Sequence, residues 1–331
     1  MAPTEGRALR RAAAITLALT AIAVGVFVAK RRRVKLHTEI ERRTGVSDDG
    51  MEFEVLGDGL RTLLFIPGGP GSEVPTGLMA KMMPSQFTPY VRAGFTVWNV
   101  TRRRNMPQGY TIADMADDYA AFVAAEIGGT VDLVVGESYG GLVAQYLAAN
   151  HPTLVHRVVL AVSAGAITDS GKDLDRRWAA ARAEGRFADA GVLFLEFALP
   201  GEDRSALRQR LGRLAGRLFV NSSVPASDLL VEAEAEWAFD ARGILPGVQA
   251  PVLIVSGDQD EFFSREIVEE TAQLIPDSTL VWIAGMGHMR AAMSPGIPRA
   301  VLEWAGAARS ASRHSRRRSA ARDKAPLEDV R

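Results

Sequence analysis

Residues 131–147 constrain the fold more than any other part of the chain. They read VDLVVGESYGGLVAQYL, an apolar run that stops at a glycine-bracketed serine and then continues with apolar residues. We interpret this stretch as a buried strand that enters a helix through a sharp Gly-x-Ser-x-Gly turn, a nucleophile elbow. Glycines on both sides keep the crowded turn free of side chains, so the hydroxyl of Ser138 is expected to stand exposed above the sheet.

Strand-like and helix-like segments alternate on both sides of this turn. Residues 112–123 place apolar side chains at helical spacing, and residues 158–162 are continuously apolar, as in a sheet covered on both faces. Further strands are expected at residues 53–56, 62–66, 94–100, 251–255 and 279–283. Strands that alternate with helices predict a doubly wound, mostly parallel α/β sheet.

The alternation is interrupted between about residues 169 and 247, where the sequence is helix-like and poor in strands. An insertion of this kind between two strands would lie over their carboxyl ends as a helical cap. We therefore expect one domain, residues 51–305, that includes the cap. Residues 306–331 are rich in arginine and serine, cannot form a core, and are expected to be a disordered basic tail.

The amino-terminal segment, residues 1–50, contains an apolar run and a charged spacer. Residues 12–29 are uncharged and include only two threonines, near the lower limit for crossing a bilayer core of roughly 30 Å. We interpret them as a single-pass membrane anchor. More basic residues follow the run than precede it, which would place the catalytic domain on the cytoplasmic side. A cleaved signal peptide, with a secreted domain, is the alternative, because arginines also precede the run.

The composition narrows the possible chemistry. Lysine plus arginine and aspartate plus glutamate both number 39, so zero net charge gives no general attraction to nucleic acid, and no nucleic-acid partner is expected. The chain has no cysteine, which excludes disulfides, thiolate catalysis and cysteine-bound metals. The glycine-rich loop at residues 68–72 lacks the lysine of a phosphate-binding loop. The basic cluster at residues 102–104 is expected to be a solvated or salt-bridged surface loop.

Two later strands are each followed by a residue that could complete a site around Ser138. Asp258 and Asp260 follow residues 251–255, and His288 follows residues 279–283 in a glycine-rich loop. Open α/β sheets build their sites at the carboxyl ends of the strands. A serine becomes a nucleophile when a histidine, held by a carboxylate, takes its proton. The sequence therefore predicts a catalytic triad in which either aspartate is the acid.

Four motifs in this order resemble the α/β-hydrolase superfamily. They are PGGPG at residues 67–71, GESYGG at 136–141, GDQD at 257–260 and GMGH at 285–288. The resemblance covers roughly residues 51–305 and implies the fold and serine triad of that superfamily. Its acid generally falls at the fourth position of the Gly-x-x-Asp turn, which implies Asp260 rather than Asp258.

The resemblance also implies an oxyanion hole formed by the backbone N–H groups of Gly69 and Tyr139. The loop departs from the family pattern at Pro67, where many relatives have histidine, so any contact made by that histidine is missing here. Dehalogenase-like and epoxide-hydrolase-like relatives need an aspartate in place of Ser138, so the serine implies acyl transfer to water through an acyl-enzyme. We expect hydrolysis of a carboxylic ester or related small acyl compound, with no cofactor and no metal.

Two alternatives remain open. The loop and the elbow also resemble proline iminopeptidase-like and tripeptidyl aminopeptidase-like hydrolases, in which acidic cap residues hold the amino terminus of the substrate. Glu232, Glu234 and Glu236 are the candidates for that role, although a solvated helix face explains them more simply. The other alternative is a non-catalytic protein that keeps the fold and binds a ligand or partner.

Overall fold

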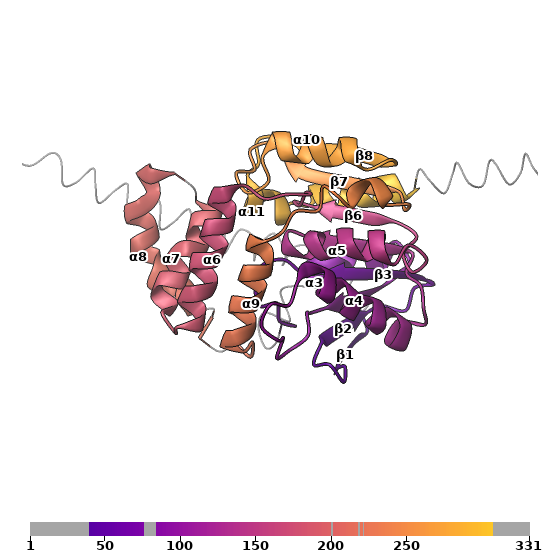
Figure 1. Ribbon diagram of the computed structural model, residues 1–331, viewed down its shortest axis with the longest axis horizontal. Helices are drawn as coiled ribbons and strands as arrows, with labels where there is room; N and C mark the ends of the chain where they lie inside the picture. Colours follow the sequence, from indigo (N-terminus) through magenta and orange to yellow (C-terminus); the bar gives the residue numbers. More distant parts are fainter. Residues whose placement is uncertain (1–39, 76–83, 200, 218, 221, 307–331) are drawn as a thin grey trace, which may run out of the picture. The chain divides into compact units, whose positions relative to one another are not determined.

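Eight strands in the described part of the chain form one sheet (Figure 1). The computed structural model describes residues 40–75, 84–199, 201–217, 219–220 and 222–306. The strand order is β1-β2-β4-β3-β5-β6-β7-β8, in which β2 pairs antiparallel with β1 and β4 and the remaining neighbours are parallel. The strands are Arg42–Val46 (β1), Glu52–Leu56 (β2), Arg61–Ile66 (β3), Phe95–Val100 (β4), Leu133–Glu137 (β5), Val158–Ala161 (β6), Val252–Gly257 (β7) and Ser278–Ile283 (β8).

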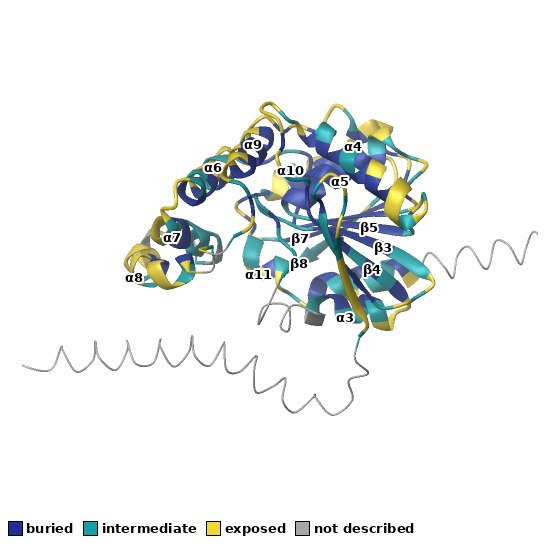
Figure 2. Ribbon diagram, turned by 90° about the horizontal axis from the view of Figure 1, so that it is seen from below, coloured by how far each residue is buried: buried dark blue, intermediate teal, exposed yellow. Residues whose placement is uncertain are grey.

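Helices cover both faces of the sheet. Helices α4, α5 and α10 lie on one face, and α3 lies on the other (Figure 2). The central strands are consequently apolar on both sides, and all residues of β6 and β7 are buried. The helices outside the insertion are Pro84–Arg92 (α3), Ile112–Phe122 (α4), Tyr139–Asn150 (α5), Arg265–Leu274 (α10) and His288–Ala292 (α11), and residues 296–306 are also helical.

The start and end of α4 follow from local chemistry. The Thr111 side chain accepts a hydrogen bond from the N–H of Asp114, and the Asp114 carboxylate accepts one from the N–H of Thr111. This reciprocal pair satisfies two N–H groups that a helix start leaves unpaired. The helix continues as a π-helical turn, Val123–Ile127 (η1), and ends at Gly128, whose φ of 97° suits glycine.

Four helices form the insertion between β6 and β7, and they stand beside the sheet in Figure 1. Helices α7 and α8 pack closely because glycines face each other: a Cβ atom on Gly191 would lie 2.0 Å from the carbonyl oxygen of Gly212. The insertion consists of Asp169–Ala183 (α6), Phe187–Ala198 (α7), Ser205–Gly216 (α8) and Ala226–Trp237 (α9), with short 3-10 turns at Glu202–Arg204 (η2) and Leu245–Gly247 (η3). The predicted fold class, a doubly wound, mostly parallel sheet with an inserted helical cap, is confirmed.

The sheet begins earlier than the sequence predicts. Strand β1 lies within the stretch expected to be a spacer, and it pairs with β2 along its whole length, Arg42 opposite Leu56 and Val46 opposite Glu52. The sequence did not indicate this strand, because four of its five residues are exposed. An edge strand of this kind lacks the apolar alternation of a core strand.

The predicted location at a membrane is contradicted. Within the part of the chain that the structure describes, no helix combines the length and the apolar character needed to cross a bilayer. The run that suggested an anchor, residues 12–29, lies outside the described residues, and so do residues 307–331 of the predicted basic tail 306–331. We therefore do not retain the anchor, or a side of the membrane, as part of the functional interpretation.

Candidate active site

Ser138 occupies a strained turn between β5 and α5. Its backbone has φ 50° and ψ −116°, a conformation that L-residues rarely adopt. Two backbone hydrogen bonds fix the turn: the N–H of Ser138 donates to the carbonyl of Ala161 at 2.9 Å, and the N–H of Gly141 donates to the carbonyl of Ser138 at 2.8 Å. The serine therefore stands immediately before the amino terminus of α5, as the motif predicts.

The glycines of the motif lie so close to neighbouring atoms that a side chain would not fit. A Cβ atom on Gly136 would lie 2.5 Å from the carbonyl oxygen of Gly140, and one on Gly140 would lie 1.9 Å from that of Ile66. A Cβ atom on Gly141 would lie 2.4 Å from the Cβ atom of Ser163. Helix α5 can approach β5, the end of β3 and the segment after β6 this closely only because these positions have no side chain.

The structure brings Ser138, His288 and Asp260 together in one hydrogen-bonded chain. Oγ of Ser138 lies 3.0 Å from Nε2 of His288, and Nδ1 of His288 lies 2.8 Å from Oδ2 of Asp260. The Asp260 side chain is fully buried and that of His288 is 10% exposed. The three residues come from the carboxyl ends of β5, β7 and β8, which this sheet places side by side except for the intervening β6.

The two candidate aspartates have different partners. The second carboxylate oxygen of Asp260 accepts hydrogen bonds from the N–H groups of Phe262 and Phe263, at 2.9 and 3.1 Å. Asp258 instead accepts a hydrogen bond from the N–H of Gly285 at 2.6 Å, which ties the loop after β7 to the loop after β8. Among the described residues no hydrogen bond joins Asp258 to His288, and the geometry favours Asp260 as the partner of the imidazole.

The surroundings of His288 favour its protonated form. Burial by itself lowers the pKa of His288, but the hydrogen-bonded carboxylate of Asp260 and the charges of Asp175 and Glu137 outweigh that effect, so the pKa is raised above 6.5. The imidazole also lies 5.1 Å from the ring of Phe262, nearly parallel to it, with Phe263 at 5.7 Å. These rings limit the orientations that the imidazole can adopt.

The loop predicted to form the oxyanion hole lies against the elbow. A Cβ atom on Gly68 would lie 3.1 Å from the Cβ atom of Ser138, so the loop after β3 touches the serine. Gly69 has φ 69°, a left-handed conformation that favours glycine. The structure records no hydrogen bond from the N–H of Gly69 or of Tyr139 to any described residue. Unpaired donors beside Ser138 are what an oxyanion needs.

Two charged residues that the sequence assigned to the surface are buried against this loop. Arg102 is 1% exposed, and its Nε atom lies 2.9 Å from Oε2 of Glu232 on α9, with both side chains fully buried. This burial was not predicted from the sequence, because a run of three arginines normally marks a solvated loop. Its position directly after β4, at the same sheet edge as Ser138, was the one available signal.

The acidic residues of α9 also differ from the expected solvated face. Glu232 and Glu236 are buried, and only Glu234 is exposed. Glu236 forms a hydrogen-bonded pair with Asp175 of α6, and burial raises the pKa of Asp175 to about 6. Burial, together with the charge of Asp175, raises the pKa of Glu236 well above its ordinary value.

Aromatic side chains form a series of ring contacts from the cap to the imidazole of His288. Trp178 of α6 packs against Phe197 of α7 with ring centroids 6.0 Å apart, and Phe197 packs against Phe262 at 5.7 Å. Phe262 in turn stacks on His288. Trp178 also lies beside the loop, where a Cβ atom on Gly69 would be 3.5 Å from its ring. The cap thus presents an apolar wall to the region around Ser138.

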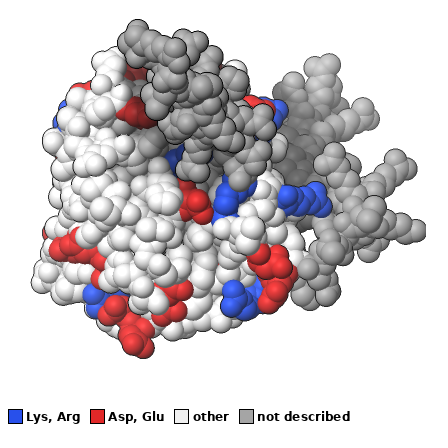
Figure 3. Space-filling view, turned by 90° about the vertical axis from the view of Figure 1, so that its right-hand side faces the viewer, with Lys and Arg blue, Asp and Glu red and all other residues white. Residues whose placement is uncertain are grey.

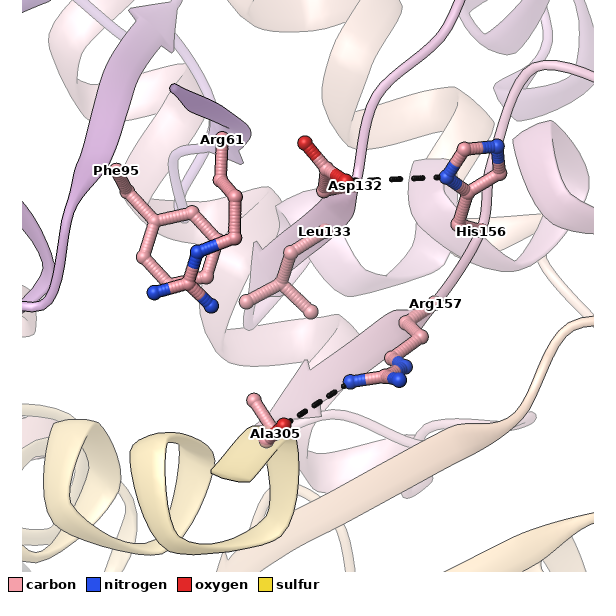
Figure 4. A pocket seen from close by; sticks show the side chains of 7 residues that line it. All are labelled: Arg61, Phe95, Asp132, Leu133, His156, Arg157 and Ala305. Atoms are coloured by element: carbon pink, nitrogen blue, oxygen red, sulfur yellow. Dashed lines mark hydrogen bonds and ion pairs between the residues drawn. The ribbon is translucent and has the colours of Figure 1, made fainter. Parts of the chain in front are cut away.

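Two further regions of the described surface can be compared with this site. On the face in Figure 3, acidic and basic side chains lie in small groups of both signs among uncharged residues. A hollow of about 240 Å³, shown in Figure 4, lies at the amino ends of the parallel strands, away from Ser138, and is lined by Arg61, Phe95, Asp132, Leu133, His156, Arg157 and Ala305. Within the described residues, no group of three or more histidines and carboxylates could hold a metal ion.

Comparison with known families agrees with the geometry. Residues 63–321 match the model of a family described as "Alpha/beta hydrolase family". The chain belongs to this family. The predicted resemblance is thereby confirmed, and the chain stands among enzymes of the hydrolase type.

Curated relatives match parts of the chain. It is 29% identical over 170 residues to the pimeloyl-[acyl-carrier protein] methyl ester esterase of Chromobacterium violaceum, which covers 47% of this chain and 62% of that protein. It is also 29% identical over 158 residues to the polyketide synthase ThaQ of Burkholderia thailandensis, which covers 47% of this chain and 8% of that protein. The chain thus spans less than two thirds of the length of either relative.

Solved structures share the fold at lower identity. The alpha/beta hydrolase enzyme MGS-M2, from a Medee basin deep-sea metagenome library, has a TM-score of 0.63 to this chain at 16% identity. The match covers 80% of this chain and 95% of that one. At this identity the likeness supports the fold alone.

Proposed function

We propose that this hydrolase cleaves a carboxylic ester, or a related acyl compound, by a serine acyl-enzyme mechanism. The observation on which the proposal rests is the hydrogen-bonded chain from Ser138 through His288 to Asp260. An esterase among the relatives is consistent with this substrate class. The aromatic wall formed by Trp178 and Phe197 suits an apolar acyl or alcohol group.

The proposed reaction has two halves. Oγ of Ser138 attacks the acyl carbon while its proton moves to Nε2 of His288, and the N–H groups of Gly69 and Tyr139 stabilise the negative oxygen. The bond to the leaving alcohol then breaks, and the alcohol takes the proton from Nε2. A water molecule repeats the sequence on the acyl-enzyme, releases the carboxylic acid and restores the serine.

Helix α5 and Asp260 supply the electrostatic stabilisation that the proposed reaction needs. The helix α5 begins at Tyr139, so its partial positive charge is directed at the oxyanion position. Asp260, held by two backbone N–H groups, keeps Nδ1 of His288 protonated and leaves Nε2 to accept the proton of Ser138.

The substitution Ser138→Ala tests the proposal. Turnover of p-nitrophenyl acyl esters should fall by at least about 10³-fold, because the nucleophile is removed. Ser170→Ala, an exposed serine at the start of α6, is the matched control and should retain wild-type turnover. A fluorophosphonate probe should label the wild type and not Ser138→Ala or His288→Ala. Unchanged ester hydrolysis by Ser138→Ala would refute the mechanism.

The buried pair Asp175 and Glu236 favours one second candidate, an aminopeptidase of the proline iminopeptidase type. Oε2 of Glu236 is buried and has no hydrogen-bond partner among the described residues, and the charge of Asp175 raises the pKa of His288. A buried carboxylate pair without a cation is a place for the ammonium group of a substrate. Glu236→Gln should then impair hydrolysis of aminoacyl p-nitroanilides while sparing neutral esters.

A further inference from the structure

The proposed oxyanion loop is fixed by a buried guanidinium rather than by its own hydrogen bonds. Nη1 of Arg102 donates to the carbonyl of Pro67 at 2.9 Å, and Nη2 donates to the carbonyl of Gly69. These two carbonyls belong to the peptide groups on either side of the Gly68–Gly69 peptide, whose N–H is the proposed oxyanion donor. With both neighbours bound to one planar cation, the direction of the Gly69 N–H is determined.

The partner of Arg102 comes from the cap. Oε2 of Glu232 lies 2.9 Å from Nε of Arg102 and also accepts a hydrogen bond from the N–H of Gly71 at 2.8 Å. Glu232 therefore holds both the arginine and the next turn of the same loop. Arg182, which is also buried and belongs to the cap helix α6, donates to the carbonyl of Pro70 at 2.7 Å.

The same pair contacts the residue that provides the other proposed donor. The guanidinium carbon of Arg102 lies 4.4 Å from the centre of the Tyr139 ring, and the hydroxyl of Tyr139 donates to the backbone carbonyl of Glu232 at 2.9 Å. Arg102 and Glu232 thus touch both residues whose N–H groups would bind the oxyanion, and neither touches His288 or Asp260 through a recorded contact within the described residues.

From this arrangement we propose that Arg102 and Glu232 are positioning residues: their ion pair sets the two halves of the oxyanion hole and makes its geometry depend on the docked cap helix α9. The inference rests on the proposed serine mechanism. A network built only for stability would not need to place its donors on the two carbonyls that flank one catalytic N–H. A buried ion pair is in any case weak evidence of stabilisation, because its desolvation offsets its attraction.

Three variants test the pair. Arg102→Lys keeps the charge but loses the planar fork that binds two carbonyls. Glu232→Gln keeps the shape and removes the charge. The double variant Arg102→Met with Glu232→Met removes both charges together, which buried pairs often tolerate without loss of folding. Arg208→Lys is the matched control, because Arg208 is also buried and donates to two carbonyls, of Leu199 and Gly201, outside the loop.

We expect kcat for p-nitrophenyl esters to fall about 10-fold to 100-fold in Arg102→Lys, and further in the double variant, with KM within about 3-fold of wild type. An aryl boronic acid, which forms a tetrahedral adduct on serine, should lose affinity by the same factor as kcat/KM. The acid limb of the pH profile should not move, because His288 and Asp260 are untouched. Arg208→Lys should keep the wild-type kcat, KM and boronate affinity, because the bonds it loses lie outside the loop.

A folded double variant with wild-type kcat, or boronate affinity that does not follow kcat/KM, would overturn the positioning role. Thermal unfolding establishes which variants are folded, and if the double variant is not, Arg102→Lys and Glu232→Gln decide the question. Failure of the serine mechanism gives a different result, because Ser138→Ala would then keep its activity and the boronate would not inhibit the wild type.

Discussion

Nδ1 of His288 lies 2.8 Å from Oδ2 of Asp260, and the other oxygen of that carboxylate accepts two backbone hydrogen bonds. The carboxylate therefore cannot rotate without breaking bonds that hold its own turn. Asp258, two residues earlier, has its carboxylate bound to the N–H of Gly285 and stabilises the loop rather than the imidazole. The two aspartates of one short turn thus have separable tasks, and substitutions can distinguish them.

Asp260→Asn should lower kcat by about three to four orders of magnitude, because an amide does not hold the tautomer of His288 that leaves Nε2 free to accept a proton. Asp258→Asn retains an oxygen that can accept from Gly285 and should reduce kcat by less than about 10-fold. Steady-state ester hydrolysis by both variants measures the difference. The opposite order of effects would identify Asp258 as the acid.

The pH dependence of kcat/KM should report the raised pKa of His288. The base must be neutral to accept the proton of Ser138, so activity is lost as the pH falls through the pKa of the folded enzyme. Burial alone would lower that pKa, but Asp260 and the other nearby carboxylates raise it, and the acid limb should therefore have its midpoint above 6.5. A profile with its midpoint below 6.5 would contradict this electrostatic account.

The sequence predicted those parts of the site that depend on local geometry. The glycines around Ser138 follow from crowding within one strand-to-helix turn, and this crowding is visible in the pattern of residues 136–141. Asp260 and His288 were predictable because strand ends of a parallel sheet meet at one edge, whatever the details of packing.

The sequence did not predict features that depend on partners far away in the chain. Arg102 and Glu232 are 130 positions apart in the chain, and each alone is typical of a solvated surface. Their burial results from the docking of α9 on the loop, which no local pattern encodes. Strand β1 was missed for a related reason, because its pairing with β2 and not its apolar content makes it a strand.

The buried carboxyl of Glu137 should make the free energy of unfolding decrease as the pH rises from acidic to neutral. Burial raises its pKa from 4.5 to about 7, with the charge of His288 acting in the opposite direction. A carboxyl with a raised pKa binds its proton more tightly when folded, so stability declines as the pH rises from 4.5 through about 7. The contribution is roughly 2 to 3 kcal/mol at 1.36 kcal/mol per pH unit, reduced for partial exposure.

Urea unfolding at pH 4.5 and pH 8 measures this contribution. Glu137→Gln should show a smaller difference in free energy of unfolding between the two values than the wild type does. Glu234→Gln, at an exposed position of α9, should leave the difference unchanged. Equal pH dependence in the wild type and Glu137→Gln would show that the carboxyl of Glu137 does not cause it.

Gly140→Ala should destabilise the fold because helix α5 lies directly on β3. The added Cβ atom would lie 1.9 Å from the carbonyl oxygen of Ile66 and 3.0 Å from that of Pro67, and backbone atoms cannot yield as a flexible side chain can. The cost should reach or exceed about 1 to 3 kcal/mol, typical of overpacking. Gly243→Ala is the control, since nothing lies within 4 Å of its added Cβ atom, and it should be neutral or slightly stabilising. Urea unfolding of the two variants decides: equal stability would mean that the close approach of α5 to β3 is not required.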